Sequence, residues 1–423
     1  MGAFDLRSRG ADEDAAVTPR YPGGVLDDVA NPHFASFLDG MRWIAASIVF
    51  LGHLRDPLFL GYGSLSAAER TPAVQLWYFV TGWFGPAVIV FFVLSGYLVG
   101  GIASARASLG KFSATSYGID RVSRLYVAFL PALALTALLD FAGSAWFADT
   151  GFWTHQQPML AEKVASAPFA SLLTPDLFLG NLFMLQTVAI PTFGSNTPLW
   201  TISLEFWFYA VFGLALFAML AKSNRRRIAA GLLLALAIGL LGGSFVAYLG
   251  LWLIGVACAF VPWRALERPW IAGLLFLGVL VAARLGQGAI DRIAFGIWIR
   301  DYAVALSFAW VLISMRHSRA SLLARVGGMN KFMADFSYSL YLIHFPLMLF
   351  VLGTLHATGR FDAIARGYSP TSTQGLAVQA AAIAIIYATA WLFASVTERQ
   401  TPAVRNWLKR FVARRVSARP EAA

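Results

Sequence analysis

Charged residues are scarce in this sequence of 423 residues. Only 13% of the residues are Asp, Glu, Lys or Arg, whereas 58% are hydrophobic. A soluble protein of this size carries charge on about a quarter of its residues. Runs of about twenty apolar residues recur along the chain, and each is long enough to cross a bilayer as a helix. The composition excludes a soluble α/β enzyme and predicts an all-α, polytopic membrane protein.

Cysteine is almost absent, and so is any sign of a cleaved leader. The single cysteine, Cys258, lies inside an apolar run and cannot form an intrachain disulfide, so we interpret it as a small core residue. Residues 1–36 are polar and lack the apolar core of a signal peptide. We expect a largely disordered cytoplasmic tail there, followed by a first spanning helix that acts as its own insertion signal.

Positive charge is the one kind in excess, with a net charge of +11. The basic residues lie in short loops between apolar segments and in the C-terminal tail, as membrane topology requires. No basic stripe is interleaved with aromatic residues, which argues against nucleic acid as a partner. Membrane lipids are the expected partner of this charge.

Apolar segments predict about ten transmembrane helices. They lie at 38–58, 76–100, 123–145, 197–221, 228–243, 245–262, 269–283, 298–315, 333–354 and 375–397. The further apolar stretch 177–190 is short for a span and would break the charge pattern. We therefore expect it to be interfacial or re-entrant.

The distribution of Lys and Arg predicts the orientation of these helices. One set of loops, together with the C-terminal tail, holds 21 of them, and the opposite loops hold eight, Arg55 and Arg284 among these. The basic side is expected in the cytoplasm, with both termini. We expect residues 37–400 to form the transmembrane domain. The basic tail 401–423 is expected to lie as an amphipathic cap on anionic lipid headgroups.

The first apolar segment carries three ionisable side chains, Asp39, Arg42 and His53. Eleven residues at 100° each bring His53 about 20° beyond three full turns from Arg42 and roughly 16 Å along the helix. Asp39 lies near the same stripe. Ionisable groups in a bilayer are costly and usually functional, so all three are candidate catalytic residues. Alternatively, Arg42 pairs with Asp39 at the membrane surface, and a neutral His53 bonds a backbone carbonyl.

The third and fourth segments carry further polar candidates. Arg121 and Arg124 are spaced i, i+3, which places two guanidinium groups on one face and suits phosphate binding; setting the topology is the alternative. Glu205, with Ser203 nearby, lies about 12 Å inside the fourth segment. A carboxylate there needs a cation or a donor, and His53 at similar depth is a candidate partner.

The second and ninth segments complete the set. Tyr338, Tyr341 and His344 lie near the middle of the ninth segment, where His344 either contacts substrate or is a satisfied core histidine. Ser95 and Gly96 interrupt an aromatic run in the second segment, which would let another helix or a ligand approach closely.

Six phrases in the right order resemble the integral-membrane acyltransferase-3 family. The first, "FLDGMRWIAASIVFLGH", matches the family's arginine followed by ten residues and a histidine, here Arg42 and His53. The phrase "FFVLSGYL" resembles the family's second-span phrase. Arg121 and Arg124 match its Arg-x-x-Arg motif.

The remaining phrases lie in the second half of the chain. "PLWTISLEFWFY" and "FSYSLYLIHFPL" resemble the family's fourth-span and ninth-span phrases, and "TERQTP" resembles its closing element with Glu398 and Pro402. Phe206 stands where many members have a second acidic residue, and three residues separate Glu398 from Pro402. We expect no soluble domain after the basic tail, which the longer members carry.

The resemblance implies an acyl-CoA-dependent O-acyltransferase of the bacterial inner membrane. The acyl-CoA, with acetyl as the commonest acyl group, is a co-substrate, and neither a permanently bound cofactor nor a metal is expected. The implied acceptor is a hydroxyl of a polysaccharide or of a lipid-linked saccharide. Acylation of a small molecule or lipid, or a non-catalytic transporter or flippase for a polar substrate, remain the alternatives.

The resemblance also implies roles for the candidate residues. Arg121 and Arg124 would hold the CoA phosphates, and His53 would take the proton of the acceptor hydroxyl or carry the acyl group itself. Glu205 would orient His53. Ser203 or Tyr338 would donate a hydrogen bond to the thioester oxygen.

Overall fold

The structure is a computed structural model that describes residues 24–157, 159–160, 167–262, 267–318 and 321–417. Within these ranges the regular elements are helices, and two isolated bridges are the nearest approach to a strand. The helices are α1 (Gly24–Ala30), α2 (Pro32–Leu58), α3 (Pro72–Val80), α4 (Phe84–Ser95), the π-helix η2 (Gly96–Gly101), α5 (Ile102–Ser108), α6 (Ala114–Trp146), α8 (Pro175–Leu182), η5 (Thr197–Leu199), α9 (Trp200–Leu220), α10 (Asn224–Cys258), α11 (Pro269–Leu285), α12 (Gln287–Ile290), α13 (Gly296–Met315), α14 (Ser321–Ala334), α15 (Ser337–His356), α16 (Thr373–Val396), η8 (Glu398–Gln400) and α17 (Thr401–Ser417).

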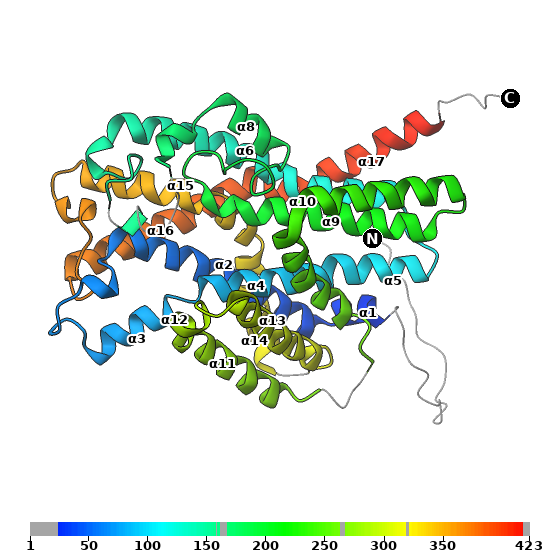
Figure 1. Ribbon diagram of the computed structural model, residues 1–423, viewed down its shortest axis with the longest axis horizontal. Coiled ribbons are helices and arrows are strands. Elements are labelled where there is room, and N and C mark those ends of the chain that lie inside the picture. The colour runs from blue at the N-terminus through cyan, green and yellow to red at the C-terminus, as the bar shows by residue number, and fades with distance from the viewer. Residues whose placement is uncertain (1–23, 158, 161–166, 263–266, 319–320, 418–423) are drawn as a thin grey trace.

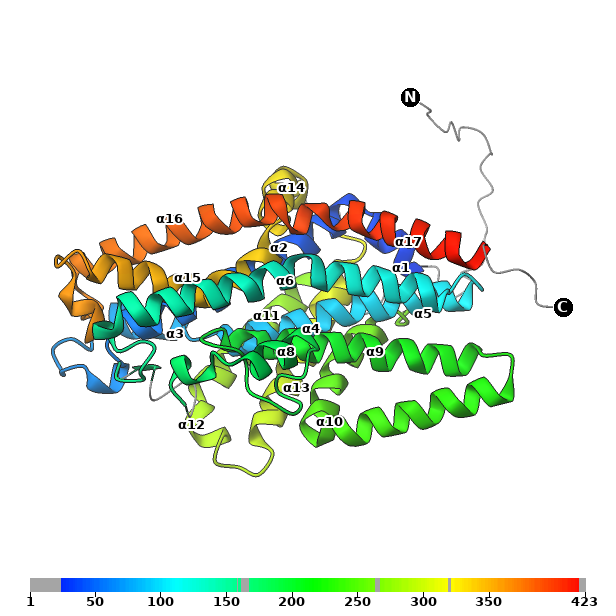
Figure 2. The same ribbon diagram turned by 90° about the horizontal axis from the view of Figure 1, so that it is seen from above.

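The long helices run roughly along the longest axis of the molecule, so the protein is an elongated bundle (Figures 1 and 2). Helix α15 lies at its centre, since 15 of its 20 residues are buried. It packs against α2, α6 and α16, and α2 packs in turn against α4 and α14. The ninth predicted segment, which α15 covers from Ser337 onward, and the first predicted segment, which lies in α2, are therefore neighbours in the core.

The described helices confirm a polytopic, all-α protein, whereas the predicted number of ten spans is not confirmed. Eight helices are long and apolar enough to cross a membrane, and α11 is a shorter apolar helix of 17 residues. The predicted segments 228–243 and 245–262 both fall within α10, which is broken at Gly242 (φ 79°, ψ 177°). Only glycine adopts this backbone conformation at little cost, so the break lies where the sequence allows it.

Small residues let two helices meet closely at the centre of the bundle, as Ser95 and Gly96 predicted. A Cβ atom on Gly96 would lie 1.9 Å from the carbonyl oxygen of Trp252, and one on Gly255 would lie 2.0 Å from that of Val93. Backbone therefore packs directly on backbone where η2 crosses α10. Trp252 also reaches back to Ser95, to whose hydroxyl its indole Nε1 donates a hydrogen bond of 3.1 Å.

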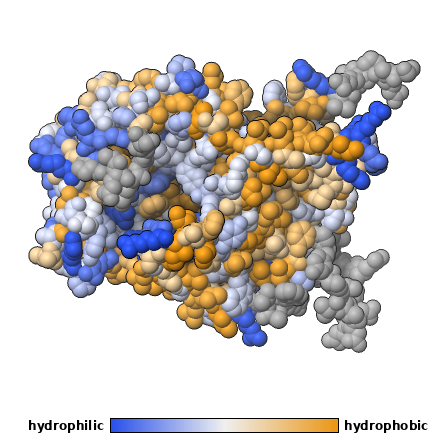
Figure 3. All heavy atoms as spheres, viewed as in Figure 1, coloured by the Kyte–Doolittle hydropathy of each residue, from blue (hydrophilic) through white to orange (hydrophobic). Residues whose placement is uncertain are grey.

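Apolar side chains cover the outside of α10 and α11. Leu232, Leu240 and Leu274 are each about two-thirds exposed, which in water would be unfavourable but suits contact with lipid. In the face seen in Figure 3, hydrophobic surface spreads over most of the bundle and hydrophilic surface gathers at the end opposite the chain termini. The bundle thus presents an apolar belt and a polar end.

Two predictions concern the chain ends, and the first needs correction. The predicted disordered tail 1–36 is helical over α1 and from Pro32 onwards, where Asn31 caps α2 by accepting a hydrogen bond from the amide of His33; residues 1–23 lie outside the described part. The basic tail forms α17, which packs along α6 and roughly continues the direction of α16 (Figure 2). Lys409 of α17 pairs with Asp120 of α6 at 2.7 Å. The helix is therefore held on the protein along one side, while Trp407 and Phe411 are exposed, and its contact with lipid headgroups stays a prediction.

The stretch 177–190 does not form a spanning helix. It begins within α8, whose eight residues cover only about 12 Å, and continues as a turn in which Met184 and Thr187 have positive φ. The surrounding loop is fastened to α6 by Asp140. This carboxylate accepts hydrogen bonds from the Trp153 indole (2.9 Å) and from the Ser195 amide (2.7 Å).

Candidate functional site

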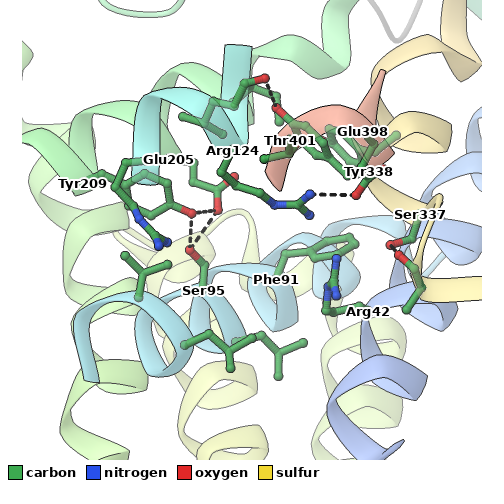
Figure 4. Close-up of a pocket in the computed structure, with 18 of the residues that line it drawn as sticks. Arg42, Phe91, Ser95, Arg124, Glu205, Tyr209, Ser337, Tyr338, Glu398 and Thr401 are labelled. Atoms are coloured by element: carbon green, nitrogen blue, oxygen red, sulfur yellow. Dashed lines mark hydrogen bonds and ion pairs between the residues drawn. The ribbon is translucent and has the colours of Figure 1, made fainter. Parts of the chain in front are cut away.

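Five of the predicted site residues line one cavity of about 570 Å³, here called the inner cavity. It lies among α2, α4, α6, α9, α15 and the start of α17, toward the end of the bundle that is predicted to be cytoplasmic. The predicted residues on its wall are Arg42, Arg121, Arg124, Glu205 and Tyr338. In Figure 4 Glu205 and Tyr209 lie on one side of it and Arg42 on the other, with Arg124 and Phe91 between them.

The arginines of the inner cavity differ in how firmly they are held. Arg124 forms an ion pair of 2.7 Å with the buried Glu398, and its guanidinium lies 4.9 Å from the centre of the Tyr338 ring. Arg121 lies between two tyrosine rings, and its Nε is buried with no hydrogen-bond partner among the described residues. Arg42 pairs with Asp39 at 3.4 Å. The i, i+3 spacing therefore brings Arg121 and Arg124 to one wall, as predicted. Of these two, Arg124 has an anionic partner and Arg121 has none among the described residues.

Glu205 belongs to the inner cavity and has a different partner from the predicted one. Its Oε1 accepts hydrogen bonds from the hydroxyl of Ser95 (2.9 Å) and from the hydroxyl of Tyr209. The pairing with His53 that its depth predicted is thus wrong. Depth along a helix is one coordinate only, and Glu205 faces α4 while His53 faces α15.

Ser203 does not line either of the two cavities described here. Its hydroxyl donates a hydrogen bond of 2.7 Å to the carbonyl oxygen of Met184, which also accepts one from the Trp207 indole. The side chain is fully buried. Ser203 therefore anchors the turn after α8 to α9, and a substrate contact has no support from its position.

His53 lines a second cavity of about 610 Å³, here called the outer cavity, toward the opposite end of the bundle. The walls come from the end of α2, the link between α3 and α4 with the start of α4, η5 with the first residue of α9, the α11–α12 junction and α15. They include Arg55, Trp200, Arg284 and Phe345. Arg55 and Arg284, which the sequence placed in loops as topology residues, thus contribute to a site.

The partner of His53 is His344. Nδ1 of His53 lies 2.9 Å from Nε2 of His344, and the two rings are nearly parallel, with 5° between their planes. Nδ1 of His344 lies 2.8 Å from the carbonyl oxygen of Tyr341. A carbonyl oxygen only accepts, so this Nδ1 carries a proton, and neutral His344 must accept at Nε2. His53 therefore donates from Nδ1, which leaves its Nε2 as the basic nitrogen.

A thin layer of side chains separates the two cavities. Tyr341 and Thr201 line the inner cavity, and their hydroxyls are 2.7 Å apart. The Tyr341 ring lies 5.8 Å from the ring of His344, which in turn bonds His53 of the outer cavity. Between Arg42 and His53 on α2, Ala46 and Phe50 are buried. The stripe of side chains predicted on α2 therefore does not border one continuous channel. Arg42 lines the inner cavity at one end of it, and His53 lines the outer cavity at the other.

Comparison with known proteins shows to which family the sequence belongs. The profile of a family described as an acyltransferase domain matches residues 36–395. An O-acetyl transferase of Shigella phage Sf6 is 27% identical over 346 residues, which are 77% of this chain and 88% of the relative. Acyltransferase MdmB of Streptomyces mycarofaciens is 29% identical over 180 residues, which are 42% of this chain and 38% of that relative. No solved structure matches the chain. The matched domain covers most of the sequence, and the protein is a member of the integral-membrane acyltransferase-3 family.

Proposed function

We propose that this membrane acyltransferase moves an acyl group, acetyl in the simplest case, from acyl-CoA in the inner cavity to a hydroxyl of a cell-surface or exported glycan in the outer cavity. The observation that carries the proposal is the hydrogen bond between His53, which lines the outer cavity, and His344, whose ring lies 5.8 Å from that of Tyr341 on the wall of the inner cavity. A soluble donor and an exported acceptor would approach the same imidazole from opposite sides of the membrane.

The inner cavity suits the phosphate end of a CoA ester. Arg121 offers an unpaired guanidinium between two tyrosine rings, and guanidinium groups bind phosphate through paired, charge-assisted hydrogen bonds. Arg399 and Arg405 line the same cavity near the start of α17. Tyr341 on the wall of this cavity lies beside His344, so the acyl thioester would pass this wall to reach Nε2 of His53.

The chemical step needs one base and one path for a proton. The acceptor hydroxyl attacks the thioester carbonyl carbon while Nε2 of His53 removes the hydroxyl proton. The carbon–sulfur bond then breaks, and the proton passes from His53 to the departing CoA sulfur. General base catalysis of this kind contributes about 10²–10⁴-fold. A two-step route, in which Nε2 first carries the acyl group and CoA leaves before the acceptor attacks, uses the same nitrogen.

His344 is a positioning residue in either route. It accepts the Nδ1 hydrogen of His53, so it holds the ring and keeps Nε2 free of a proton. When His53 becomes charged, the same hydrogen bond strengthens because its donor is then cationic.

The direct test is transfer of radiolabelled acetyl from acetyl-CoA in isolated membranes. Membranes with the protein should label surface or precursor glycan, and membranes of a host without the gene should not. Mass spectrometry of the host polysaccharide should show added acetyl groups on hydroxyls only when the protein is present. Identical labelling and identical glycan mass in the two hosts would refute the proposal.

A further inference from the structure

Arg284 is the least neutralised cation of the outer cavity. It lies in the last turn of α11, where Nη1 donates to the side-chain oxygen of Gln287 (2.8 Å) and Nη2 donates to the carbonyl oxygen of Tyr78 (3.2 Å). Both partners are neutral. Its Nε is buried and has no hydrogen-bond partner among the described residues. A planar guanidinium is thus fixed in place with a donor left over.

The other arginine of the outer cavity is already paired. Arg55 donates from Nη2 to Asp56 at 2.7 Å and from Nη1 to the hydroxyl of Thr81 at 3.0 Å. With the Arg55–Asp56 pair counted as neutral and His53 uncharged, Arg284 leaves the lining residues with a formal charge of +1.

One face of the Arg284 guanidinium lies against the backbone of Gly82, with no side chain in between. A Cβ atom on Gly82 would lie 2.6 Å from Nη2 and 2.7 Å from Cζ and Nε. Gly82 therefore allows the guanidinium to lie flat against the backbone between α3 and α4. Any larger residue would displace it, so the position of this charge is built into the fold.

Aromatic side chains supply the rest of the binding surface. Phe84, Trp200 and Phe345 line the outer cavity together with His53 and Arg284. Aromatic faces bury the apolar faces of sugar rings, and one fixed cation orients a ligand that has a complementary charge.

The geometry points to an acceptor of defined class: a saccharide that carries an anionic group, carboxylate or phosphate, held by Arg284 so that a neighbouring hydroxyl lies at Nε2 of His53. This inference rests on the proposed transfer reaction in one respect, namely that the bound saccharide is the acceptor. The binding site itself does not depend on that reaction and can be tested without it.

The test measures binding of three probes to the full-length protein in detergent. The probes are methyl glucuronide (carboxylate), glucose 1-phosphate (phosphate) and methyl glucoside (neutral), and the readout is the ligand-induced rise in melting temperature as a function of ligand concentration. Wild type should bind at least one anionic probe about tenfold or more tightly than the glucoside, in keeping with a charge-assisted hydrogen bond. The preference between the two anions identifies the charged group.

Arg284→Gln should remove that preference, whereas Arg284→Lys should keep part of it because the charge remains. Arg292→Gln is the matched control, since Arg292 is exposed at the same end of the bundle and does not line the outer cavity. Equal affinity for all three probes in wild type would overturn the inference, and so would equal losses in Arg284→Gln and Arg292→Gln.

His53→Ala separates the inference from the proposed function. The variant should keep the wild-type preference for the anionic over the neutral probe, which Arg284 supplies, and transfer no acetyl. Arg284-dependent binding in a wild type that transfers no acetyl would refute the proposed function and support the site. Transfer to a neutral glycan with no gain from an anionic group would support the function and refute the site.

Discussion

The hydrogen bond between His53 and His344 determines which nitrogen of each ring is basic. Because the Tyr341 carbonyl fixes the proton of His344 on Nδ1, His53 must expose Nε2 as its basic atom. Among the described residues, no carboxylate takes part in this series of hydrogen bonds. A neutral histidine thus does for His53 what an aspartate does in a Ser-His-Asp triad, by orienting the ring and fixing its tautomer.

His344→Gln and His344→Ala test this role. The glutamine side chain offers an acceptor oxygen near the position of Nε2, so His344→Gln should retain a substantial part of the transfer rate. His344→Ala should lower kcat by about 10–100-fold with an unchanged KM for acetyl-CoA, because only orientation of the base is lost. Steady-state kinetics in proteoliposomes give both constants. If the glutamine variant is as slow as the alanine variant, or if KM alone changes, His344 does not position the base.

Arg121 and Arg124 should give different phenotypes. Arg121→Ala should weaken acetyl-CoA binding about tenfold while leaving thermal stability close to wild type, since Arg121 forms no ion pair in the described structure. Arg124→Ala should weaken binding and also lower the melting temperature, because the buried Glu398 loses its ion-pair partner.

Calorimetric titration and thermal unfolding measure these two effects. Arg225→Ala is the control, as Arg225 is exposed near the start of α10 and lies outside the inner cavity. Unchanged donor affinity in both Arg121→Ala and Arg124→Ala would return these arginines to a role in topology.

The spacing of residues within one helix predicted which side chains share a face of that helix. It could not predict contacts between helices. Arg42 and His53 lie on one helix, so the 3.6-residue repeat placed them correctly, whereas His344 is 291 residues from His53 in sequence. Arg284 was counted only as a loop charge for the same reason. Asp140 went unnoticed although it lies in an apolar helix, and its partners Trp153 and Ser195 make it a structural anchor.

At the scale of elements, the crossing of η2 and α10 is the tightest helix contact near the inner cavity. Gly96 lies beside the Trp252 backbone, and Ser95, which begins the Glu205 network, is the preceding residue. A change in this crossing would therefore move Glu205's hydrogen-bond partner. The crossing of η2 and α10 is thus directly connected to the wall of the inner cavity, which Ser95 lines.

Gly96→Ala should destabilise the protein by about 1–3 kcal/mol, because a methyl group would overlap the Trp252 carbonyl. Gly231→Ala is the matched control. Gly231 lies in α10 with no atom within 4 Å of its would-be Cβ, so its substitution should be neutral or stabilise by up to about 1 kcal/mol. Thermal unfolding in detergent compares them. Equal melting temperatures for the two variants would show that the crossing is looser than described.

Apolar runs predicted the elements because each long run must become a helix in a bilayer. The break of α10 at Gly242 falls within the last two residues of the predicted span 228–243, so the pattern located it closely even though the count of ten is not confirmed. For the tail, composition shows that α17 is basic and amphipathic but does not predict that it packs along α6. Its ion pair with Asp120 is a tertiary contact.

At the scale of the whole molecule, transfer from a cytoplasmic donor to an exported acceptor requires that the two cavities open to opposite sides of the membrane. The excess of Lys and Arg predicts which end is cytoplasmic. Cys258, the single cysteine, is buried, so a Cys258→Ala background provides a clean starting point for labelling.

Single cysteines in that background should report the orientation. A membrane-impermeant maleimide applied to intact spheroplasts should label Ser66→Cys, on the exposed loop before α3, and should label Lys222→Cys, between α9 and α10, only after lysis. Both positions are exposed in the structure, which makes each the control for the other. Labelling of Lys222→Cys in intact cells would invert the assigned topology.

The central claim is that the imidazole of His53, on the wall of the outer cavity, carries the transfer. It is tested most directly by His53→Ala in the radiolabelled acetyl-CoA assay, with His356→Ala as the matched histidine control because His356 lines neither cavity. At equal protein levels in the membrane, His53→Ala should transfer at least about 10²-fold less acetyl than wild type, and His356→Ala should match wild type. Transfer by His53→Ala at the wild-type rate would contradict the account.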